Sequence, residues 1–116
     1  MFFKEPKDTN EIYWTRHIKE KMRYYRLSEG LLRRILRNPK RREKGIAPRT
    51  VALMQPGNAK KPSEIWLMYQ LVGRKKKMIS AWRYPGISPI GEPIPIPEDI
   101  LEELRKKVFD KTREIE

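Results

Sequence analysis

The sequence contains no cysteine and a single histidine, His17, in 116 residues. Without cysteine the chain has no disulfide scaffold, no thiol chemistry and no cysteine-based zinc site, and one histidine excludes a histidine-rich metal cluster. No apolar run approaches the roughly 20 residues of a membrane-spanning helix, and residues 1–11 lack the apolar segment of a secretory signal. We therefore expect a small, soluble, cytoplasmic protein that needs no metal or other cofactor.

Acidic side chains are scarce before the C-terminal segment. Residues 1–97 hold eight of the 15 acids, and these show neither a paired spacing nor a metalloprotease-type motif. The chain also lacks a glycine-rich phosphate loop and a Gly-x-Ser-x-Gly turn. These absences argue against two-metal nucleases, carboxylate-dyad enzymes, nucleotide-dependent enzymes and serine hydrolases. Any catalysis must use histidine, lysine, arginine or tyrosine.

Basic side chains dominate the rest of the chain. Lys and Arg number 27, so the formal net charge is +12, and residues 16–49 alone contain thirteen bases and three acids. Such a block attracts polyanions, because each neutralised phosphate releases condensed counterions. RNA is the favoured partner. An anionic membrane surface, DNA and a merely soluble basic surface are the alternatives.

Two amphipathic helices are expected after residues 1–11, which we expect to be flexible. The first carries apolar side chains four, four and three positions apart, and Thr15 is its expected N-cap. Ser28 is the expected N-cap of the second helix, and Asn38-Pro39 ends that helix.

The apolar spacing changes from that of a helix to that of a strand after the second helix. Residues 40–49 predict a short edge strand, and the main strands are expected at residues 50–54, 64–72 and 77–84. The pattern predicts an α+β fold in which two N-terminal helices pack on a three- to four-stranded antiparallel sheet, with residues 12–86 forming the domain.

A proline-rich connector and a further helix are expected at the C-terminal end. Residues 85–97 contain five prolines, which exclude a central strand or a helix, and we place the connector at residues 87–97. Residues 98–116 are expected to form an additional helix that docks on the sheet or on the first helix of the same domain. This helix could instead mediate a dimer, so the chain is expected to be a monomer or a homodimer.

Four side chains are candidates for metal-independent RNA cleavage, in which the 2′-hydroxyl attacks its own phosphate. Such a reaction needs a base, an acid and positive charge on the phosphorane. His17 is the only residue with an ordinary pKa near neutrality, and Lys21 follows one helical turn later. Arg83 is suited to bidentate contact with a phosphate, and Tyr84 to orienting the nucleophile. In the alternative interpretation, His17 anchors its helix through a carbonyl and Lys21 is a solvated charge.

A second set of basic residues predicts an RNA-tracking surface. These residues run along the outer face of the second helix into the following loop, with a further group at a hairpin. A solvated charged face is the alternative. The predicted RNA-binding residues are Arg33, Arg34, Arg37, Lys40, Arg41, Arg42, Lys75 and Lys76.

Three short motifs resemble, in order and spacing, the bacterial family catalogued as domain-of-unknown-function 4258. The family opens roughly with His-Ala-x-x-Arg-Met-x-x-Arg-Gly-Ile-Ser, and residues 15–28 of this chain resemble that opening. The identical positions are His17, Met22 and Ser28, and Leu27 is a conservative match. Asn38-Pro39 and the strand Met78–Tyr84 resemble its later motifs, so the resemblance covers roughly residues 12–86.

This family is similar to the RelE- and BrnT-type toxins, small basic proteins of which many cleave RNA without a metal, often mRNA on the ribosome. The resemblance implies a RelE-like fold, a functional role for His17 and Arg83, and an antitoxin partner. The chain departs from the family pattern, which has arginine where this chain has Lys21 and Tyr25, and glycine where it has Arg26. The hypotheses are therefore a metal-independent endoribonuclease, a non-catalytic RNA- or ribosome-binding module on the same fold, and a protein–protein module.

Overall fold

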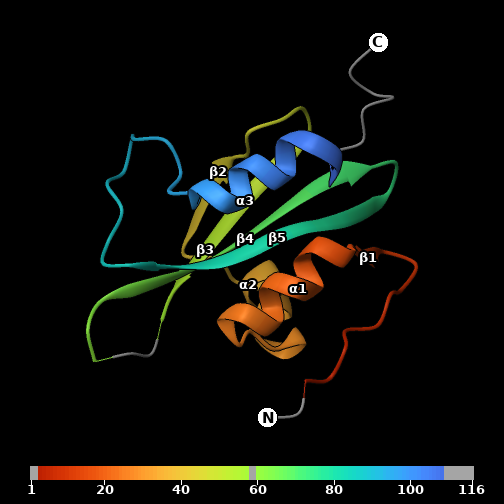
Figure 1. Ribbon diagram of the computed structural model, residues 1–116, viewed down its shortest axis with the longest axis horizontal. Helices are drawn as coiled ribbons and strands as arrows, with labels where there is room; N and C mark the ends of the chain where they lie inside the picture. The colour runs from red at the N-terminus through yellow and green to blue at the C-terminus, as the bar shows by residue number, and fades with distance from the viewer. Residues whose placement is uncertain (1–2, 58–59, 109–116) are drawn as a thin grey trace.

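The computed structural model describes residues 3–57 and 60–108, which form a five-stranded sheet with helices on both faces (Figure 1). The strands lie in the order β1-β5-β4-β3-β2. Along the chain the elements are β1 (Ile12–Trp14), α1 (Arg16–Tyr25), α2 (Glu29–Arg37), β2 (Arg41–Lys44), β3 (Thr50–Pro56), β4 (Ser63–Val72), β5 (Lys75–Pro85), α3 (Glu98–Glu103) and a π-helical turn (Leu104–Val108). The predicted α+β class, the two N-terminal helices, the short edge strand and the C-terminal helix are confirmed.

The sheet differs from the prediction in strand number and in direction. It has five strands rather than three or four, and it is mixed, because β1 pairs in parallel with Lys76–Met78 of β5. The sequence pattern predicted no strand before the first helix. A three-residue strand is too short to show a period, and its partner lies more than sixty residues further along the chain. The last expected helix, residues 98–116, is described only to Val108, and residues 109–116 lie outside the described part.

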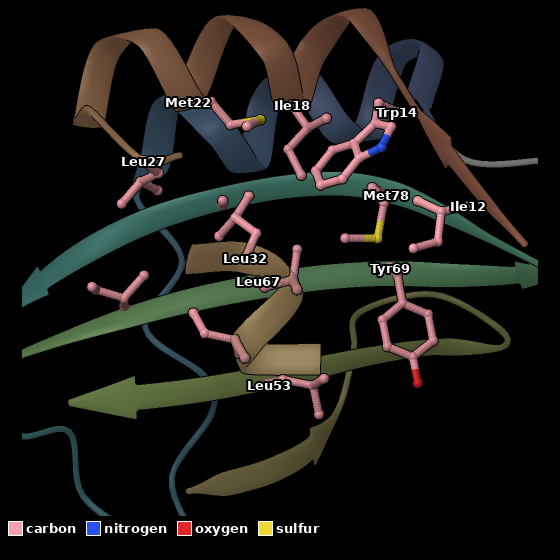
Figure 2. Close-up of a cluster of buried hydrophobic side chains, with 13 residues drawn as sticks. Ile12, Trp14, Ile18, Met22, Leu27, Leu32, Leu53, Leu67, Tyr69 and Met78 are labelled. Carbon is pink, nitrogen blue, oxygen red and sulfur yellow. The ribbon is translucent and has the colours of Figure 1, made fainter. Parts of the chain in front are cut away.

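One hydrophobic cluster fills the space between the sheet and the first two helices. Ile18 and Met22 of α1 and Leu32 of α2 are fully buried against Leu67 and Met78 of the central strands (Figure 2). Each side chain of this size contributes about 1.5–3 kcal/mol by its burial. This cluster fixes α1 and α2 on the sheet.

A second cluster lies on the opposite face, beneath α3. Ile100 and Leu104 are fully buried there against Trp66 and Trp82, whose rings stack with centroids 6.2 Å apart and planes 7° apart. The C-terminal helix therefore docks on the sheet, and Figure 1 shows it on the side away from α1 and α2. The helical layers are thus held on the two faces by separate clusters.

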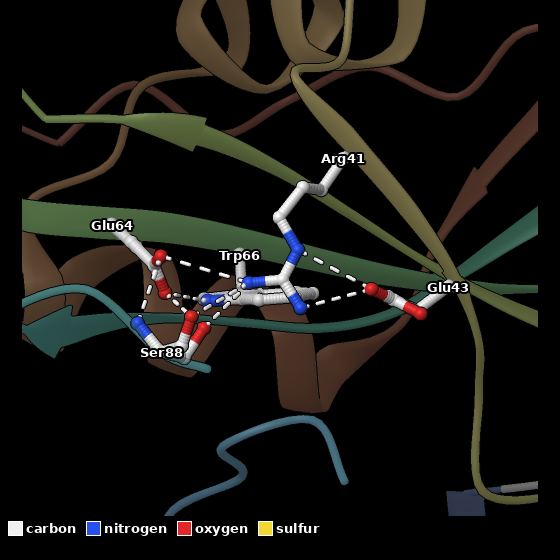
Figure 3. Close-up of polar contacts among 5 residues, drawn as sticks. All are labelled: Arg41, Glu43, Glu64, Trp66 and Ser88. Carbon is white, nitrogen blue, oxygen red and sulfur yellow. Dashed lines mark hydrogen bonds and ion pairs between the residues drawn. The ribbon is translucent and has the colours of Figure 1, made fainter. Parts of the chain in front are cut away.

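The connector before α3 is tied to the sheet by a buried polar network (Figure 3). The carboxylate of Glu64, only 3% exposed, accepts hydrogen bonds from Ser88 N–H, Ser88 Oγ and Trp66 Nε1 at 3.1, 2.7 and 3.0 Å. Arg41 Nη1 lies 3.8 Å from Glu64 Oε2 and donates to Ser88 Oγ at 2.8 Å. The guanidinium also lies over the Trp66 ring, 5.2 Å from its centroid, and pairs with Glu43. This network holds Ser88, at the start of the connector, against the sheet before the chain reaches α3.

The helix caps follow the predicted pattern. Thr15 Oγ1 accepts from Ile18 N–H, and Ser28 Oγ accepts from Leu31 N–H, both at 3.1 Å. Thr15 and Ser28 are therefore confirmed as N-caps. After Tyr25 the chain turns through Arg26, whose φ of 58° lies in the left-handed region.

Candidate functional site

The candidate site is built where α1 runs along β5. Thr15 Oγ1 donates to the carbonyls of Met78 and Ile79 at 2.8 and 3.2 Å, which fixes the first turn of α1 against the strand. Among the described residues, no strand pairs with the outer edge of β5 beyond Met78. The N-terminal turn of α1 therefore holds His17 over this edge.

His17 is almost fully buried, with 7% of its surface exposed, and both ring nitrogens face protein groups. Nε2 lies 2.9 Å from Ser80 Oγ, and Nδ1 lies 3.4 Å from Glu103 Oε2. A β-bulge directly precedes Ser80, since the pairing with β4 shifts register between Met68 and Tyr69. Bulges re-aim the side chains of their strand. The result is a serine–histidine–glutamate arrangement, but its serine is fully buried and has no access to a substrate.

A cleft of about 530 Å³ opens beside the imidazole. It contains three basic side chains, from Arg16, Lys77 and Lys106, and two acidic ones, from Glu20 and Glu103. The acids come from α1 and α3 on either side of His17. They oppose the approach of a phosphate, so the cleft has no dominant sign of charge.

Burial lowers the pKa of His17 below its ordinary value, because the charged imidazolium is poorly solvated there. The carboxylate of Glu103 acts in the opposite direction, and the ammonium of Lys21 adds to the lowering. The net direction is downward. His17 is therefore a neutral imidazole at neutral pH.

Lys21 is held by the acidic side chains of α3. Its Nζ lies 3.1 Å from Glu103 Oε1 and 3.5 Å from Asp99 Oδ2. Burial lowers the pKa of Lys21, but the hydrogen bond and charge of Glu103, with those of Asp99, outweigh it and raise the pKa overall. The predicted phosphate-stabilising charge is thus already neutralised by the protein.

The structure does not bring Arg83 and Tyr84 to His17. Arg83 Nε donates to the Tyr25 carbonyl at 2.8 Å, at the far end of α1. That carbonyl lies eight residues beyond His17, or roughly 12 Å along the helix axis at 1.5 Å per residue. Tyr84 packs against the second cluster, on the other face of the sheet. Of the four predicted catalytic residues, only His17 and Lys21 lie together.

The eight predicted RNA-binding residues divide into three groups. Arg33 pairs with Glu29 at 2.8 Å, and Arg41, with a side chain 12% exposed, belongs to the polar network around Glu64. Lys75 and Lys76 lie at the β4–β5 hairpin, where Lys76 Nζ is 5.8 Å from the centroid of the Tyr69 ring. The remaining members are exposed, and they are Arg34, Arg37, Lys40 and Arg42.

The α3 acids Asp99 and Glu103 were not among the predicted site residues, although their spacing indicates a shared helix face. Asp99 and Glu103 are four residues apart on one helix, and His17 and Lys21 are four residues apart on another. Residues at this spacing lie on the same helix face. Two complementary pairs of this kind predict a contact between the helices. Ser80 carried no such signal, because the bulge that re-aims it is not readable in the sequence.

Comparison of the chain with family models, with curated proteins and with solved structures finds no match. Within residues 3–57 and 60–108, no cluster of histidine, cysteine, aspartate or glutamate side chains is arranged to hold a metal ion. No helix in this part of the chain is long and apolar enough to cross a bilayer.

Proposed function

We propose that this chain is a non-catalytic RNA-binding module that uses the α2–β2 basic surface, formed by Arg34, Arg37, Lys40 and Arg42. Arg42 lies opposite Leu53 of β3, which belongs to the cluster beneath α2. Directly opposed residues of a sheet share a face. Arg42 is thus on the same side of the sheet as Arg34 and Arg37 of α2.

The observation that carries the proposal is that this surface has no acidic partner among the described residues. All four side chains are exposed, and no carboxylate of the described residues lies within ion-pair distance of them. The acids that are nearby in sequence are already engaged, Glu29 with Arg33 and Glu43 with Arg41. Unpaired cations spread over a helix and a neighbouring strand suit a phosphate backbone, whose charges they neutralise without reading bases.

Metal-independent RNA cleavage by a RelE-like toxin is the second candidate, and one observation favours it. The neutral imidazole of His17 lines a cleft that also contains Arg16 and Lys77. A neutral imidazole can take the proton of the 2′-hydroxyl as this oxygen attacks the phosphorus. The resulting imidazolium can give that proton to the 5′-oxygen as its bond to phosphorus breaks, which leaves a 2′,3′-cyclic phosphate and a free 5′-hydroxyl. We rank this candidate below RNA binding, because acidic side chains line the cleft and Arg83 lies far from His17. The cytoplasm, where we expect the chain, supplies RNA in both cases.

Fluorescence anisotropy with a labelled single-stranded RNA at several salt concentrations tests the binding proposal. Replacing the four residues of the α2–β2 basic surface by glutamine should weaken binding by at least tenfold at low salt. The slope of log K against log salt should decrease by about 0.7 for each phosphate that the variant no longer neutralises. The control replaces Arg74 and Lys75, exposed at the β4–β5 hairpin, and should have a much smaller effect for each residue replaced.

Two results would count against this ranking. An equal loss of binding free energy for each replaced residue in the surface variant and in the hairpin control would mean that RNA responds only to total charge. RNA cleavage in the presence of EDTA, with cyclic phosphate ends that disappear in His17→Gln, would favour the ribonuclease hypothesis over the non-catalytic module. Binding without cleavage on free or ribosome-bound RNA supports the non-catalytic module.

A further inference from the structure

A second cleft, of about 620 Å³, lies between the N-terminal segment and the junction of α1 with α2. Its apolar part is formed by the half-buried ring of Phe3, with the fully buried Met22 and Leu27 beneath it. Basic side chains surround this part, including Lys4 and Arg26. The cleft is separate from the one beside His17, and no residue lines both.

Arg26 occupies a backbone position that favours glycine. Its φ is 58°, and the helix end has the Schellman pattern, in which Leu27 N–H bonds Met22 O at 2.9 Å and Arg26 N–H bonds Arg23 O at 3.3 Å. Glycine is the usual left-handed residue of this motif, because a Cβ is strained there. Glycine at this position would make the fold more stable. Stability therefore does not explain the arginine side chain, which indicates a role in binding.

Gly30, in the same cleft, is a glycine at a position where the backbone does not require one. It is the second residue of α2, its φ is outside the left-handed region, and a Cβ placed on it would meet no atom within 4 Å. Alanine or leucine therefore fits the backbone and favours a helix more than glycine does. The missing side chain leaves this wall of the cleft open.

The charges of the cleft select an anion. Four bases and one acid line it, namely Lys4, Arg23, Arg26, Arg33 and Glu29. Arg23 pairs with Glu5 and lies over the Phe3 ring, 4.8 Å from its centroid, while Arg33 pairs with Glu29. Lys4 and Arg26 have no carboxylate within ion-pair distance among the described residues. A half-buried aromatic ring beside two cations that have no acidic partner among the described residues suits a ligand with a flat apolar body and a phosphate.

We propose that this cleft binds one nucleoside phosphate, with its base against Phe3 and its phosphate held by Arg26 and Lys4. The ligand is a free mononucleotide or one unit of a bound RNA strand, and in the second case the inference rests on the proposed RNA binding. Mononucleotide binding explains both residues. The Arg26 side chain supplies positive charge to the cleft, and a large side chain at position 30 would fill it.

Titration of the ¹⁵N-labelled chain with adenosine 5′-monophosphate, followed by amide chemical shifts, tests the proposal. Shifts are expected in residues 26–33, and inorganic phosphate and adenosine alone should each bind at least tenfold more weakly. Gly30→Leu should weaken mononucleotide binding at least tenfold by filling the cleft. Gly30→Ala, its matched control, adds only a methyl group and should change binding by less than threefold.

Arg26→Gly separates binding from folding. Because glycine relieves the left-handed strain, we expect the Tm to rise by about 4 °C while mononucleotide binding weakens at least tenfold. A variant that is more stable but binds less tightly has not lost binding through misfolding. The proposal is wrong if the shifts map elsewhere, or if both Gly30→Leu and Arg26→Gly bind the mononucleotide as the unmodified chain does.

The same variants distinguish this proposal from the RNA-binding proposal. If single-stranded RNA binds through the α2–β2 basic surface but no mononucleotide binds in the cleft, RNA binding stands and the cleft proposal is wrong. If the unmodified chain binds the mononucleotide but no RNA, the cleft is supported as a site for a free nucleotide and the RNA-binding proposal fails. If Gly30→Leu weakens both ligands, the cleft holds one unit of the strand.

Discussion

The Nδ1 of His17 lies 3.4 Å from the Oε2 of Glu103, so the first turn of α1 and the last turn of α3 meet at this pair. Glu103 also binds Lys21, which makes one carboxylate the partner of two basic side chains. The two helices pack on opposite faces of the sheet and come together over the edge of β5. Their contact closes one side of the cleft beside His17.

The folded chain should lose stability as the pH falls, through His17. Burial lowers its pKa in the folded state, so below about 6.5 the unfolded chain takes up a proton that the folded chain resists. The free energy of unfolding should therefore decline from about pH 6.5 down to the folded-state pKa, and be fully present above 6.5. Urea denaturation between about pH 5 and pH 8 measures it. His17→Gln, which does not titrate, should show a smaller decline in this window.

The single histidine also makes its pKa directly measurable, because its ring signals in a ¹H–¹³C spectrum need no assignment. The midpoint should lie below 6.5. Glu103→Gln should lower it further, since the carboxylate favours the charged imidazole. A midpoint above 6.5 in the unmodified chain would contradict the burial argument.

Glu64 should be among the most sensitive positions of the fold. Glu64→Ala leaves Arg41 without its buried acceptor and removes the three hydrogen bonds that tie Ser88 and Trp66 to the carboxylate. Removing one partner of a buried ion pair costs about 3–5 kcal/mol. The free energy of unfolding in urea measures this effect. Glu29→Ala, at a more exposed pair with Arg33, is the control and should cost about 0.3–0.5 kcal/mol. Similar decreases at the two positions would refute this view of the network.

Thr15 should matter for the attachment of α1 as well as for its cap. Its hydroxyl accepts from Ile18 N–H and donates to the carbonyls of Met78 and Ile79. Thr15→Ala removes both functions and should cost about 1–2 kcal/mol. Thr15→Ser retains the hydroxyl and should recover most of this stability. Thermal unfolding followed by circular dichroism compares the three proteins, and an unchanged Tm in Thr15→Ala would show that the cap contributes little.

Local signals were sufficient for some parts of this fold. The caps at Thr15 and Ser28 were readable because a capping side chain acts on an amide only three residues away. The three central strands, β3, β4 and β5, were predictable because each is long enough to show its apolar pattern. The left-handed turn was not predicted, because an arginine at position 26 gives no sign of a positive φ.

Other features depend on contacts between distant residues. β1 exists because Ile12–Trp14 pairs with a strand more than sixty residues away. The engagement of His17 with Ser80 depends on a bulge in β5, and its engagement with Glu103 depends on where α3 docks. Arg41 was predicted to bind RNA, yet its guanidinium lies in the network around Glu64 because β2 faces the connector at that point. None of these partners is near in sequence.

Arg83 should prove to be a residue of the helix end rather than of a phosphate site. Its guanidinium donates to the carbonyls of Tyr25 and Arg26 at 2.8 and 3.4 Å, where α1 has unpaired acceptors and the negative end of its dipole. Arg83→Gln should lower the free energy of unfolding by about 1 kcal/mol and speed hydrogen exchange in the last turn of α1. RNA affinity should change by less than twofold. A tenfold decrease in RNA affinity at unchanged stability would instead return Arg83 to the binding site, as the sequence resemblance implied.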